Sequence, residues 1–242
     1  MHKKVIGIIP ARYQSTRFPG KPVAEIAGIP MIVRVYQSAV QSKFLDTLAV
    51  ATDDERIKKV CSRYSVPCIM TGECLSGSDR VYSAVKNSNE DVIVNIQGDE
   101  PLIAPEVIDG VIVPFFQDEH IHVVTAKKKI TFRQEIESPN NVKVVTDNED
   151  FAVYFSRSVI PYNRDNREVD YYKHIGIYAY SRAALKFFTN HPQSHLEKAE
   201  NLEQLRFIEN GWKIKVITTD YDAIGVDIPE DIKKVEKILS QK

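Results

Sequence analysis

The stretch Asp91–Ile96, DVIVNI, is a nearly continuous run of apolar residues with the length of one β-strand. Runs of this kind are typical of strands that are buried on both faces of a parallel sheet. The polar, turn-forming residues Gln97-Gly98-Asp99-Glu100-Pro101 follow it directly. The sequence therefore predicts a central strand that ends in an acidic loop.

Strand-length apolar runs and amphipathic segments alternate before this stretch. The pattern predicts strands at Val5–Pro10, Thr47–Thr52 and Pro67–Met70, and helices at Ile29–Gln41, from Asp53 and Asp54 through Tyr64, and near Asp79–Lys86. This βαβαβ order with short connections indicates an α/β fold with a Rossmann-like, doubly wound, mostly parallel sheet. Ligands of such sheets bind at the carboxyl ends of the strands.

The pattern changes after about residue 120, where strand-like runs are crowded together. They are HVVTAKK, NVKVVTD, FAVYFSR and KHIGIYAY, which indicate antiparallel additions or a small β subdomain at about 121–180. Helices are predicted at Arg182–Asn190 and Lys198–Asn210, a strand at Lys213–Thr218, and a last helix from Pro229, a residue favoured in the first helical turn. Because repeats and linkers are absent from the sequence, we expect one domain over residues 1–242.

Composition limits the partners and the compartment. The 242 residues are 43% hydrophobic and 27% charged with a formal net charge of −1, so no overall field attracts nucleic acid or an anionic membrane. Three cysteines without CxxC spacing fit a reducing compartment. The first apolar run stops at Pro10, and none reaches the roughly 20 residues of a membrane span. We therefore expect a soluble cytoplasmic protein with neither nucleic-acid nor membrane partners.

The loop after the first predicted strand is cationic. The stretch Ile8–Pro22, IIPARYQSTRFPGKP, places Arg12, Arg17 and Lys21 among residues that stiffen the chain or permit close approach. Arginine and lysine are natural partners of phosphate oxygens. Neither a Walker A motif nor a GxGxxG motif is present. The loop is either a solvated cationic surface or a phosphate site, and its place after a strand favours phosphate.

Three other loops carry polar groups, and each has both a structural and a ligand-binding interpretation. Asp99 suits a hard divalent cation such as Mg²⁺, whereas Glu100 is as readily explained by a solvated turn. In IGVDIPED, Asp227 either caps the helix that Pro229 begins or supplies a second metal carboxylate. In LSGSDR, Ser78 or Asp79 caps a helix, or the free N–H groups of that helix end bind an anion or a base edge.

The β-rich region holds a further group of polar side chains. They are Arg157, Lys173, His174 and Tyr178, joined by Glu203, Gln204 and Arg206 on a predicted helix. Tyr178 and His174 have a structural reading as core residues. Together with the cations, the group instead suits an acidic, hydroxyl-rich substrate.

These motifs together resemble a known family. The segments IPARYQSTRFPGKP, ATDDERI, SGSDR, VNIQGDEP, VKVV, YFSRSVIPY, KHIGIYAY, ENLEQLR and GVDIPED occur in the order and spacing of the 3-deoxy-manno-octulosonate cytidylyltransferases, or CMP-Kdo synthetases. The resemblance covers essentially the whole chain. It implies a nucleotide-diphospho-sugar transferase fold and Mg²⁺-dependent transfer of CMP from CTP to the anomeric hydroxyl of Kdo, with release of pyrophosphate, for lipopolysaccharide synthesis. It also implies a homodimer formed through the β elaboration.

The resemblance assigns roles to matching residues. It implies that Arg12, Lys21 and Asp99 are catalytic, and that Asp99 and Asp227 hold Mg²⁺. The implied nucleotide-binding residues are Pro10, Ala11, Arg12, Arg17, Lys21, Ser76, Gly77, Arg80 and Gln97. The implied sugar-acid residues are Arg157, His174, Tyr178, Glu203 and Gln204.

Two departures from the commonest family pattern leave alternatives open. SGSDR has serine and aspartate where many members have Thr and Glu, which are conservative changes. Lys173 stands where some members have Arg, and this change bears on the acceptor: an 8-amino analogue of Kdo or another ulosonic acid is the alternative. A non-catalytic nucleotide-sugar-binding protein is the alternative from another class, although the combination of Lys21, Asp99 and Asp227 argues for catalysis.

Overall fold

The computed structural model describes residues 3–15 and 17–241, which form a nine-stranded mixed sheet with helices on both faces. Its main path has the order β11-β7-β10-β6-β1-β4-β5, and β8 and β9 lie off this path. The strands are β1 (Val5–Pro10), β4 (Thr47–Thr52), β5 (Cys68–Met70), β6 (Val92–Asn95), β7 (Val123–Lys129), β8 (Lys143–Thr146), β9 (Ala152–Ser156), β10 (Tyr172–Ser181) and β11 (Lys215–Thr218). A separate two-stranded hairpin joins β2 (Glu25–Ile26) and β3 (Ile29–Pro30).

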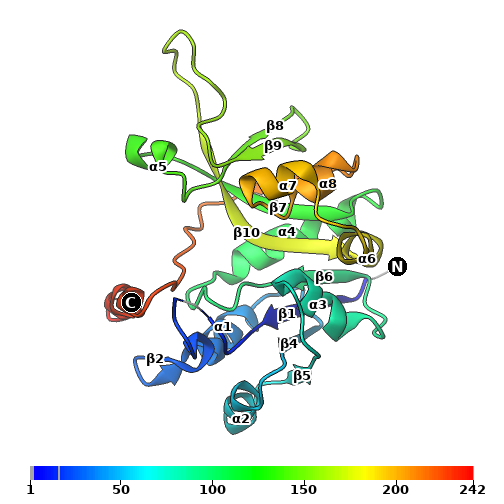
Figure 1. The fold of residues 1–242 in the computed structure, drawn as a ribbon, viewed down its shortest axis with the longest axis vertical. Coiled ribbons are helices and arrows are strands. Elements are labelled where there is room, and N and C mark those ends of the chain that lie inside the picture. The colour runs from blue at the N-terminus through cyan, green and yellow to red at the C-terminus, as the bar shows by residue number, and fades with distance from the viewer. Residues whose placement is uncertain (1–2, 16, 242) are drawn as a thin grey trace.

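The helices divide between the two faces of the sheet (Figure 1). They are α1 (Met31–Ala39), α2 (Glu55–Arg63), α3 (Gly77–Val85), α4 (Pro105–Gln117), α5 (Arg133–Glu137), α6 (Arg182–Asn190), α7 (His195–Glu200), α8 (Leu205–Glu209) and α9 (Pro229–Leu239), with a 3₁₀ turn at Lys21–Val23. Buried side chains of α1, α2 and α4 form one core layer with the sheet, and those of α3, α6 and α8 form the other. Alternate residues of β1 enter the two layers, as expected for a strand covered on both faces.

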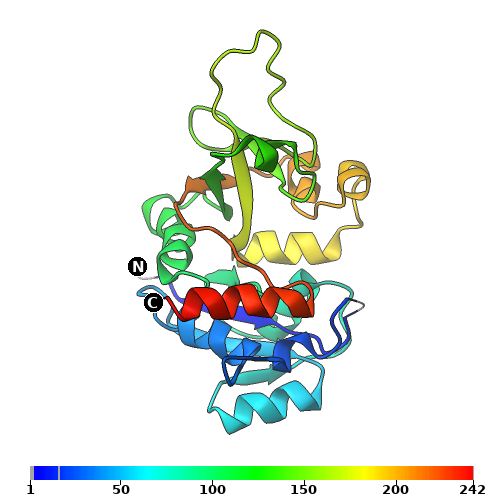
Figure 2. The ribbon, with the colours of Figure 1, turned by 90° about the vertical axis from the view of Figure 1, so that its left-hand side faces the viewer.

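The predicted fold class is confirmed. β1 pairs in parallel with β4 and β6, and β4 with β5. β10 is antiparallel to β6 and β7, and β11 is parallel to β7. Of the crowded strand-like runs, β7 and β10 extend the main sheet, whereas β8 and β9 pair with each other beside it. The loop between β9 and β10 projects from the body of the molecule in both views (Figures 1 and 2).

Two helical expectations were wrong. The single helix predicted at Lys198–Asn210 is two helices, because Asn201 adopts a left-handed conformation (φ 54°) that ends α7. Glu203 and Gln204 therefore lie in the turn before α8 rather than on a long helix. Helix α4 was not predicted, because its apolar residues are distributed around the helix and Pro114 lies inside it.

The last helix forms a small core of its own. Val235 of α9 and Val226 pack with Ile26 and Met31, and Figure 2 shows α9 lying across the part of the molecule that carries α1. The connection runs from β11, at one edge of the sheet, to α9, which lies beside α1 in the other half of the molecule (Figures 1 and 2). This crossing brings Asp227 to the loops that follow β1 and β6.

A buried lysine holds the strands beside the projecting loop. The Lys143 side chain is 0% exposed, and its ammonium donates to the main-chain oxygens of Ser138 (2.9 Å), Asn141 (2.6 Å) and Arg157 (2.6 Å). Loss of hydration lowers the pKa of Lys143. The three carbonyl dipoles compensate for the burial of this charge.

We predict that Lys143→Met lowers the free energy of unfolding by about 2–4 kcal/mol, because three carbonyl groups lose a charged donor. Urea denaturation measures this change. The matched control is Lys58→Met, whose exposed ion pair with Glu55 makes a change within about 0.5 kcal/mol the expected result. Equal effects of the two substitutions would contradict the role assigned to Lys143.

Candidate active site

The cationic loop after β1 folds back on itself. The Gly20 N–H donates to the Tyr13 carbonyl (2.9 Å), and the Lys21 N–H donates to the Phe18 carbonyl (3.1 Å). Gly20 has φ 75°, and a Cβ atom there would lie 3.1 Å from the Tyr13 hydroxyl. The left-handed conformation therefore favours glycine, and a larger residue would also have to displace the end of the Tyr13 side chain. The closure starts the 3₁₀ turn at Lys21 and fixes the direction of its side chain.

Two cations of this loop contact the two predicted metal carboxylates. Lys21 Nζ lies 2.7 Å from Asp99 Oδ2 and 3.9 Å from Asp227 Oδ1, and it also donates to the Val226 carbonyl (2.9 Å). The Arg17 guanidinium donates to both Asp227 oxygens at 3.1 Å. Three loops that are distant in the sequence thus meet through opposite charges. Asp227 is not the cap of α9: Ile228 is the N-cap residue, and Asp231 accepts hydrogen bonds from the N–H groups of Asp227 and Ile228.

The acidic loop lies directly against the end of β1. A Cβ atom on Gly98 would lie 2.8 Å from the Pro10 carbonyl oxygen, so only glycine permits this approach. Gln97 donates from Nε2 to the Gly176 carbonyl (3.1 Å), which ties the loop to β10. These contacts place Asp99 beside the cationic loop.

The amino end of α3 faces the same space. Ser76 is its N-cap and forms a capping box with Asp79, so the predicted cap at Ser78 or Asp79 was wrong by position. Ser78 donates instead to Glu203 Oε2 (2.9 Å). The N–H groups at such a helix end point outward and attract partial negative charge.

Arg80 is held rigidly below that helix end. Its guanidinium donates to Asp53 Oδ2 and to Thr71 Oγ1, both at 2.7 Å, and the residue is buried. Asp54, not Asp53, caps α2 by accepting from the Arg56 N–H (2.9 Å). Asp53 therefore serves to orient Arg80, a role that the sequence pattern did not reveal.

These loops enclose a cavity of about 410 Å³ at the carboxyl ends of β1 and β6. It is lined by Pro10, Ala11, Arg12, Ser15, Arg17, Lys21, Pro22, Cys74, Leu75, Ser76, Gly77, Arg80, Gln97, Gly98, Asp99, Glu203 and Asp227. All residues expected to bind nucleotide line this cavity, as do both expected metal carboxylates. Within residues 3–15 and 17–241 the Arg12 side chain makes neither an ion pair nor a hydrogen bond, so its charge is available to a ligand.

Of the residues expected to bind the sugar acid, only Glu203 lines the cavity. Loss of hydration raises the pKa of Glu203, and the hydrogen bond from Ser78 opposes this rise. Arg157 lies near the end of α7, where it donates to the carbonyls of Glu200 (2.9 Å) and Pro139 (3.0 Å). Gln204 is buried in the turn beside Glu203. The expected set is therefore spread between the cavity wall and the residues behind it.

His174 and Tyr178 form part of that second group. The His174 ring lies between Phe155 and Tyr178, with ring centroids 5.2 and 5.3 Å away, and Nε2 is 2.9 Å from the Thr125 hydroxyl oxygen. Loss of hydration lowers the pKa of His174 to about 3, so the ring is neutral at pH 7. Tyr178 is buried and stacks on Tyr180 at 5.5 Å. Burial also raises the pKa of Tyr178.

Glu100 departs from the expectation of a solvated side chain. It is only 7% exposed, and it accepts a hydrogen bond from the Tyr221 hydroxyl at 3.0 Å. Loss of hydration raises the pKa of Glu100 to about 7, with a further increase from neighbouring Asp99. The short polar loop gave no sign of this burial, because the residue that covers Glu100 comes from the distant connection between β11 and α9.

Asp99 and Asp227 could hold a divalent metal ion together. Both approach one cation, the Lys21 ammonium, so a small cation at that place would have an oxygen ligand from each. The described residues contain no group of three or more metal-type side chains that could hold a metal ion. Such a site fits Mg²⁺, which keeps water and phosphate oxygens beside one or two carboxylates.

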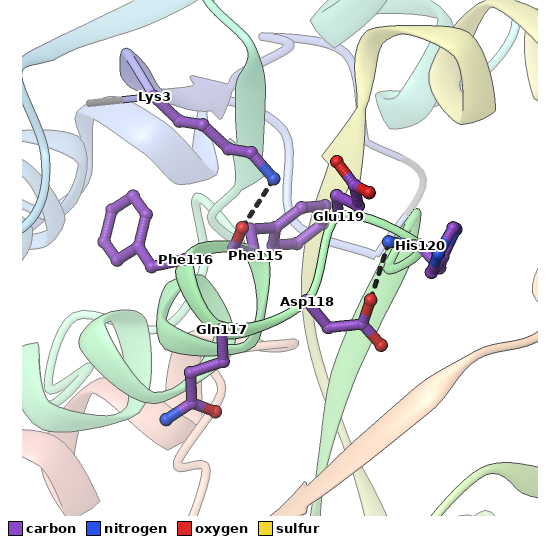
Figure 3. Close-up of a pocket in the computed structure, with 7 residues that line it drawn as sticks. All are labelled: Lys3, Phe115, Phe116, Gln117, Asp118, Glu119 and His120. Carbon is purple, nitrogen blue, oxygen red and sulfur yellow. Dashed lines mark hydrogen bonds between the residues drawn. The ribbon is translucent and has the colours of Figure 1, made fainter. Parts of the chain in front are cut away.

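A second hollow lies at the other end of β1 (Figure 3). It is lined by Lys3 and by residues 115–120 at the end of α4. The Lys3 side chain turns toward the Phe115 carbonyl and donates to it, and the His120 N–H donates to Asp118 at 2.8 Å. The Lys3 contact satisfies a carbonyl in the last turn of α4, and the Asp118 contact closes the turn that follows, so we assign the hollow a structural role.

The geometry agrees with comparisons to known proteins. Residues 6–216 match the family described as "Cytidylyltransferase". A solved structure of CMP:2-keto-3-deoxy-manno-octonic acid synthetase complexed with CTP is 38% identical, with a TM-score of 0.95 over 98% of this chain and 99% of that one. The fold is also shared with 4-diphosphocytidyl-2C-methyl-D-erythritol synthase from Anaerococcus prevotii, at 16% identity and a TM-score of 0.65 over 99% of this chain and 100% of that one. The chain is therefore a member of the cytidylyltransferase family.

Curated relatives narrow the assignment. A protein of Desulfosudis oleivorans named 3-deoxy-manno-octulosonate cytidylyltransferase is 48% identical over 98% of each chain. The mitochondrial protein of that name from Arabidopsis thaliana is 42% identical over 99% of this chain and 84% of its own. Within the family, the chain belongs with the 3-deoxy-manno-octulosonate cytidylyltransferases, which confirms the resemblance seen in the sequence.

The raised pKa of Glu100 predicts a pH-dependent stability. Between about pH 4.5 and pH 7 the folded state holds a proton that the unfolded state has lost, so this group's contribution to stability falls as pH rises. Glu100→Gln removes this titration. We predict that the free energy of unfolding of this variant, minus that of the unaltered protein, is about 3 kcal/mol larger at pH 8.5 than at pH 4.5, so the variant gains relative stability at high pH. Urea denaturation at both pH values measures this, and an equal difference at the two values would contradict it.

Proposed function

We propose that this chain is a Mg²⁺-dependent 3-deoxy-manno-octulosonate cytidylyltransferase, which transfers CMP from CTP to the anomeric hydroxyl of Kdo and releases pyrophosphate. The observation that carries the proposal is the meeting of Lys21, Arg17, Asp99 and Asp227 at the mouth of one cavity that Arg12 also lines. Cations for a triphosphate and carboxylates for a metal ion are thus present at one place. We infer that the product serves lipopolysaccharide synthesis, the use implied by the family.

The ion pairs of the site support a proposal for how the substrate binds. Lys21 and Arg17 neutralise Asp99 and Asp227, so the two carboxylates are not left unpaired beside each other. A triphosphate offers these cations new partners, and a divalent cation offers the carboxylates a new partner at the same moment. We therefore infer that CTP and Mg²⁺ enter together by exchange of ion pairs.

The cations then act on the charge that develops during the reaction. The acceptor hydroxyl gives up its proton to water as its oxygen attacks the α-phosphorus, the bond from that phosphorus to the bridging oxygen breaks, and negative charge grows on the leaving pyrophosphate. Arg12, Arg17 and Lys21 are placed to stabilise this charge. When bound, Mg²⁺ supplies Lewis-acid stabilisation of phosphate charge. Loss of one such group typically costs about 3–4 kcal/mol, or roughly 10²–10³ in rate.

The nucleoside part has a separate set of contacts. Pro10 and Ala11 form one wall, and Ser76 and Gly77 at the amino end of α3 form another. A Cβ atom on Gly77 would lie 3.7 Å from Pro10 Cγ, which shows how near the two walls are. Arg80, held by Asp53, offers a fixed cationic group between them. We propose that this part of the cavity takes the cytosine and ribose.

The wall near Glu203 supports an oxygen-rich acceptor. Behind this wall, three buried polar atoms of the described residues have no hydrogen-bond partner: Asn95 Oδ1, the Tyr178 hydroxyl and Gln204 Nε2. Asn95 and Tyr178 are register partners in β6 and β10, and Gln204 follows Glu203 in the chain. Unpaired buried polar groups are costly, and a sugar acid has many hydroxyl groups that can pair with them. Arg157 is the proposed partner of its carboxylate.

Lys173 bears on the choice between Kdo and its 8-amino analogue. Its ammonium pairs with Asp222 at 2.7 Å and Glu135 at 3.3 Å. The protein therefore already neutralises the charge of Lys173. This residue does not decide between Kdo and 8-amino-Kdo, and the two sugars must be compared by experiment. Kdo is our proposal because the relatives carry its name.

We also propose a cytoplasmic homodimer. Described residues include no helix long and apolar enough to cross a membrane, and all three cysteines are free thiols. The loop between β9 and β10 projects from the molecule and exposes apolar side chains, among them Tyr162 at 86%. Exposed apolar groups gathered on a projection favour burial against a second subunit.

The first prediction concerns the reaction. We expect Mg²⁺-dependent pyrophosphate release from CTP with Kdo, and roughly 10²–10³-fold slower release by Asp99→Asn or Lys21→Met. A coupled pyrophosphate assay with Kdo and 8-amino-Kdo in parallel measures it. Pyrophosphate release with 8-amino-Kdo alone would identify that sugar as the acceptor. CTP binding without pyrophosphate release for either sugar would favour the non-catalytic binding protein.

The second prediction concerns assembly. We expect size-exclusion chromatography with light scattering to give twice the 27.5 kDa chain mass. Tyr162→Asp places a charge on the projecting loop and should shift the equilibrium toward monomer. Glu149→Lys, a charge change elsewhere on the surface, is the control. A monomer at micromolar concentration for the unaltered protein would contradict the proposal.

A further inference from the structure

The two metal-binding carboxylates reach the site in different ways. Asp99 lies in a short loop between β6 and α4, next to buried strands. Asp227 lies at the end of an irregular connection that covers residues 219–228 between β11 and α9 (Figure 2). Because this connection lacks the hydrogen-bond pattern of a helix or strand, individual contacts must set the place of Asp227.

On the cavity side, Val226 provides two of these contacts. Its N–H donates to the Asp99 carbonyl (2.9 Å), and its carbonyl accepts from Lys21 Nζ (2.9 Å). The Val226 side chain is fully buried in the small core with Ile26 and Met31. We expect binding of a triphosphate to draw Lys21 away, so one of the two polar contacts is lost during function.

Behind the cavity, Tyr221 and Glu100 provide a contact that does not depend on Lys21. The Tyr221 hydroxyl donates to Glu100 Oε2 at 3.0 Å. Glu100 follows Asp99 directly in the chain, yet the cavity lining includes Asp99 and not Glu100. The two side chains of one loop therefore have different partners: Asp99 faces the ligand site, and Glu100 holds the connection that carries Asp227.

Burial of the Glu100 carboxyl group costs free energy, so the pair of Glu100 and Tyr221 is expected to have a functional advantage. A carboxyl group that is 7% exposed loses most of its hydration, and among the described residues neither Arg nor Lys pairs with Glu100 to compensate. An apolar pair of similar size would fill the same space without that cost. A hydrogen bond, however, fixes the separation and direction of two groups, whereas apolar contacts permit sliding.

We propose that Glu100 and Tyr221 are a positioning pair, which holds the Asp227 segment against the Asp99 loop and sets the spacing of the two carboxylates for a divalent cation. This inference rests on the proposed metal role of Asp99 and Asp227. Neither Glu100 nor Tyr221 is among the residues that line the ligand cavity. Partners of this kind, one layer behind metal ligands, typically change metal affinity by about 10- to 100-fold when they are removed.

Asp222 gives the segment a separate anchor. Its carboxylate pairs with Lys173 (2.7 Å) and Lys128 (3.0 Å), which belong to β10 and β7. These pairs tie the connection to β7 and β10 directly after Tyr221, and neither pair involves the Asp99 loop. Loss of the Tyr221 hydroxyl should therefore leave the segment attached while loosening it over Asp99.

The experiment measures metal binding without the acceptor sugar. Mn²⁺ is titrated into protein saturated with CTP, and free Mn²⁺ is followed by electron paramagnetic resonance, with a CTP-only titration subtracted. CTP binding in EDTA and thermal unfolding are measured on the same samples. The variants are Tyr221→Phe, Glu100→Leu and Glu100→Gln, and the matched control is Tyr171→Phe, which loses a hydroxyl that donates to the Pro161 carbonyl in the projecting loop.

For Tyr221→Phe and Glu100→Leu we expect the dissociation constant of Mn²⁺ to rise about 10- to 100-fold, with CTP binding in EDTA changed less than twofold. Glu100→Gln retains an oxygen that accepts from Tyr221, so it should retain the Mn²⁺ affinity. Tyr171→Phe should leave both affinities unchanged. Glu100→Gln keeps the accepting oxygen and removes the charge, so it separates the effect of the hydrogen bond from that of the negative charge.

Three outcomes would overturn the proposal. Unchanged Mn²⁺ affinity in Tyr221→Phe would show that Val226 and Asp222 suffice to place Asp227. An equal loss in Glu100→Gln and Glu100→Leu would assign the effect to the negative charge of Glu100 rather than to the hydrogen bond. Absence of CTP-dependent Mn²⁺ binding in the unaltered protein would remove the metal role itself, whereas Mn²⁺ binding without CMP transfer to Kdo would contradict only the proposed reaction.

Discussion

The ammonium of Lys21 joins the three parts of the site. It contacts Asp99 from the loop after β6, the Val226 carbonyl from the connection to α9, and, at longer range, Asp227. Without a cation at this point, two carboxylates and a carbonyl would face one another in a partly enclosed space, and their mutual repulsion would separate the loops. The same charge is suited to a triphosphate. The contact that assembles the site is thus made of groups that the substrates are proposed to take over.

The sheet makes this meeting possible. β1 and β6 are parallel neighbours, so the loops that follow them emerge at the same edge. The approach of Gly98 to the Pro10 carbonyl brings the second loop into contact with the first, and the left-handed Gly20 turns Lys21 toward both. β10, antiparallel to β6, then contributes Tyr178 opposite Asn95 on the side where Glu203 lines the cavity. Phosphate, metal and acceptor groups therefore gather around adjacent strands of one sheet.

Buried polar groups near the site differ in whether the protein completes their hydrogen bonds. The Lys143 ammonium has three carbonyl partners, one for each of its donors, and the Arg80 guanidinium is held by Asp53 and Thr71, so both are rigid supports. The Glu100 carboxyl group accepts one hydrogen bond, from Tyr221, which lies in the same connection between β11 and α9 as Asp227. The Tyr178 hydroxyl and Gln204 Nε2 lack partners within the described residues. This gradient, from completed to incomplete pairing, is consistent with rigid support behind a wall that a polar ligand completes.

The sequence by itself determined the alternation of strands and helices before the acidic loop, the doubly wound sheet, the cationic loop and the family, but it did not reveal α4 or the division between α7 and α8. Local patterns suffice for these features, because a buried strand, a helix cap and a proline-glycine turn are each encoded by neighbouring residues. The motifs also placed Arg12, Lys21 and Asp99 together, since parallel strands bring their following loops to one edge. Only the tertiary structure decided that Glu100 is buried, that Asp53 orients Arg80, and that Asp227 pairs with Arg17 instead of capping α9. Each of these depends on a partner far away in the chain, and the energy of a charged side chain is set by the partner and the hydration that the fold leaves it.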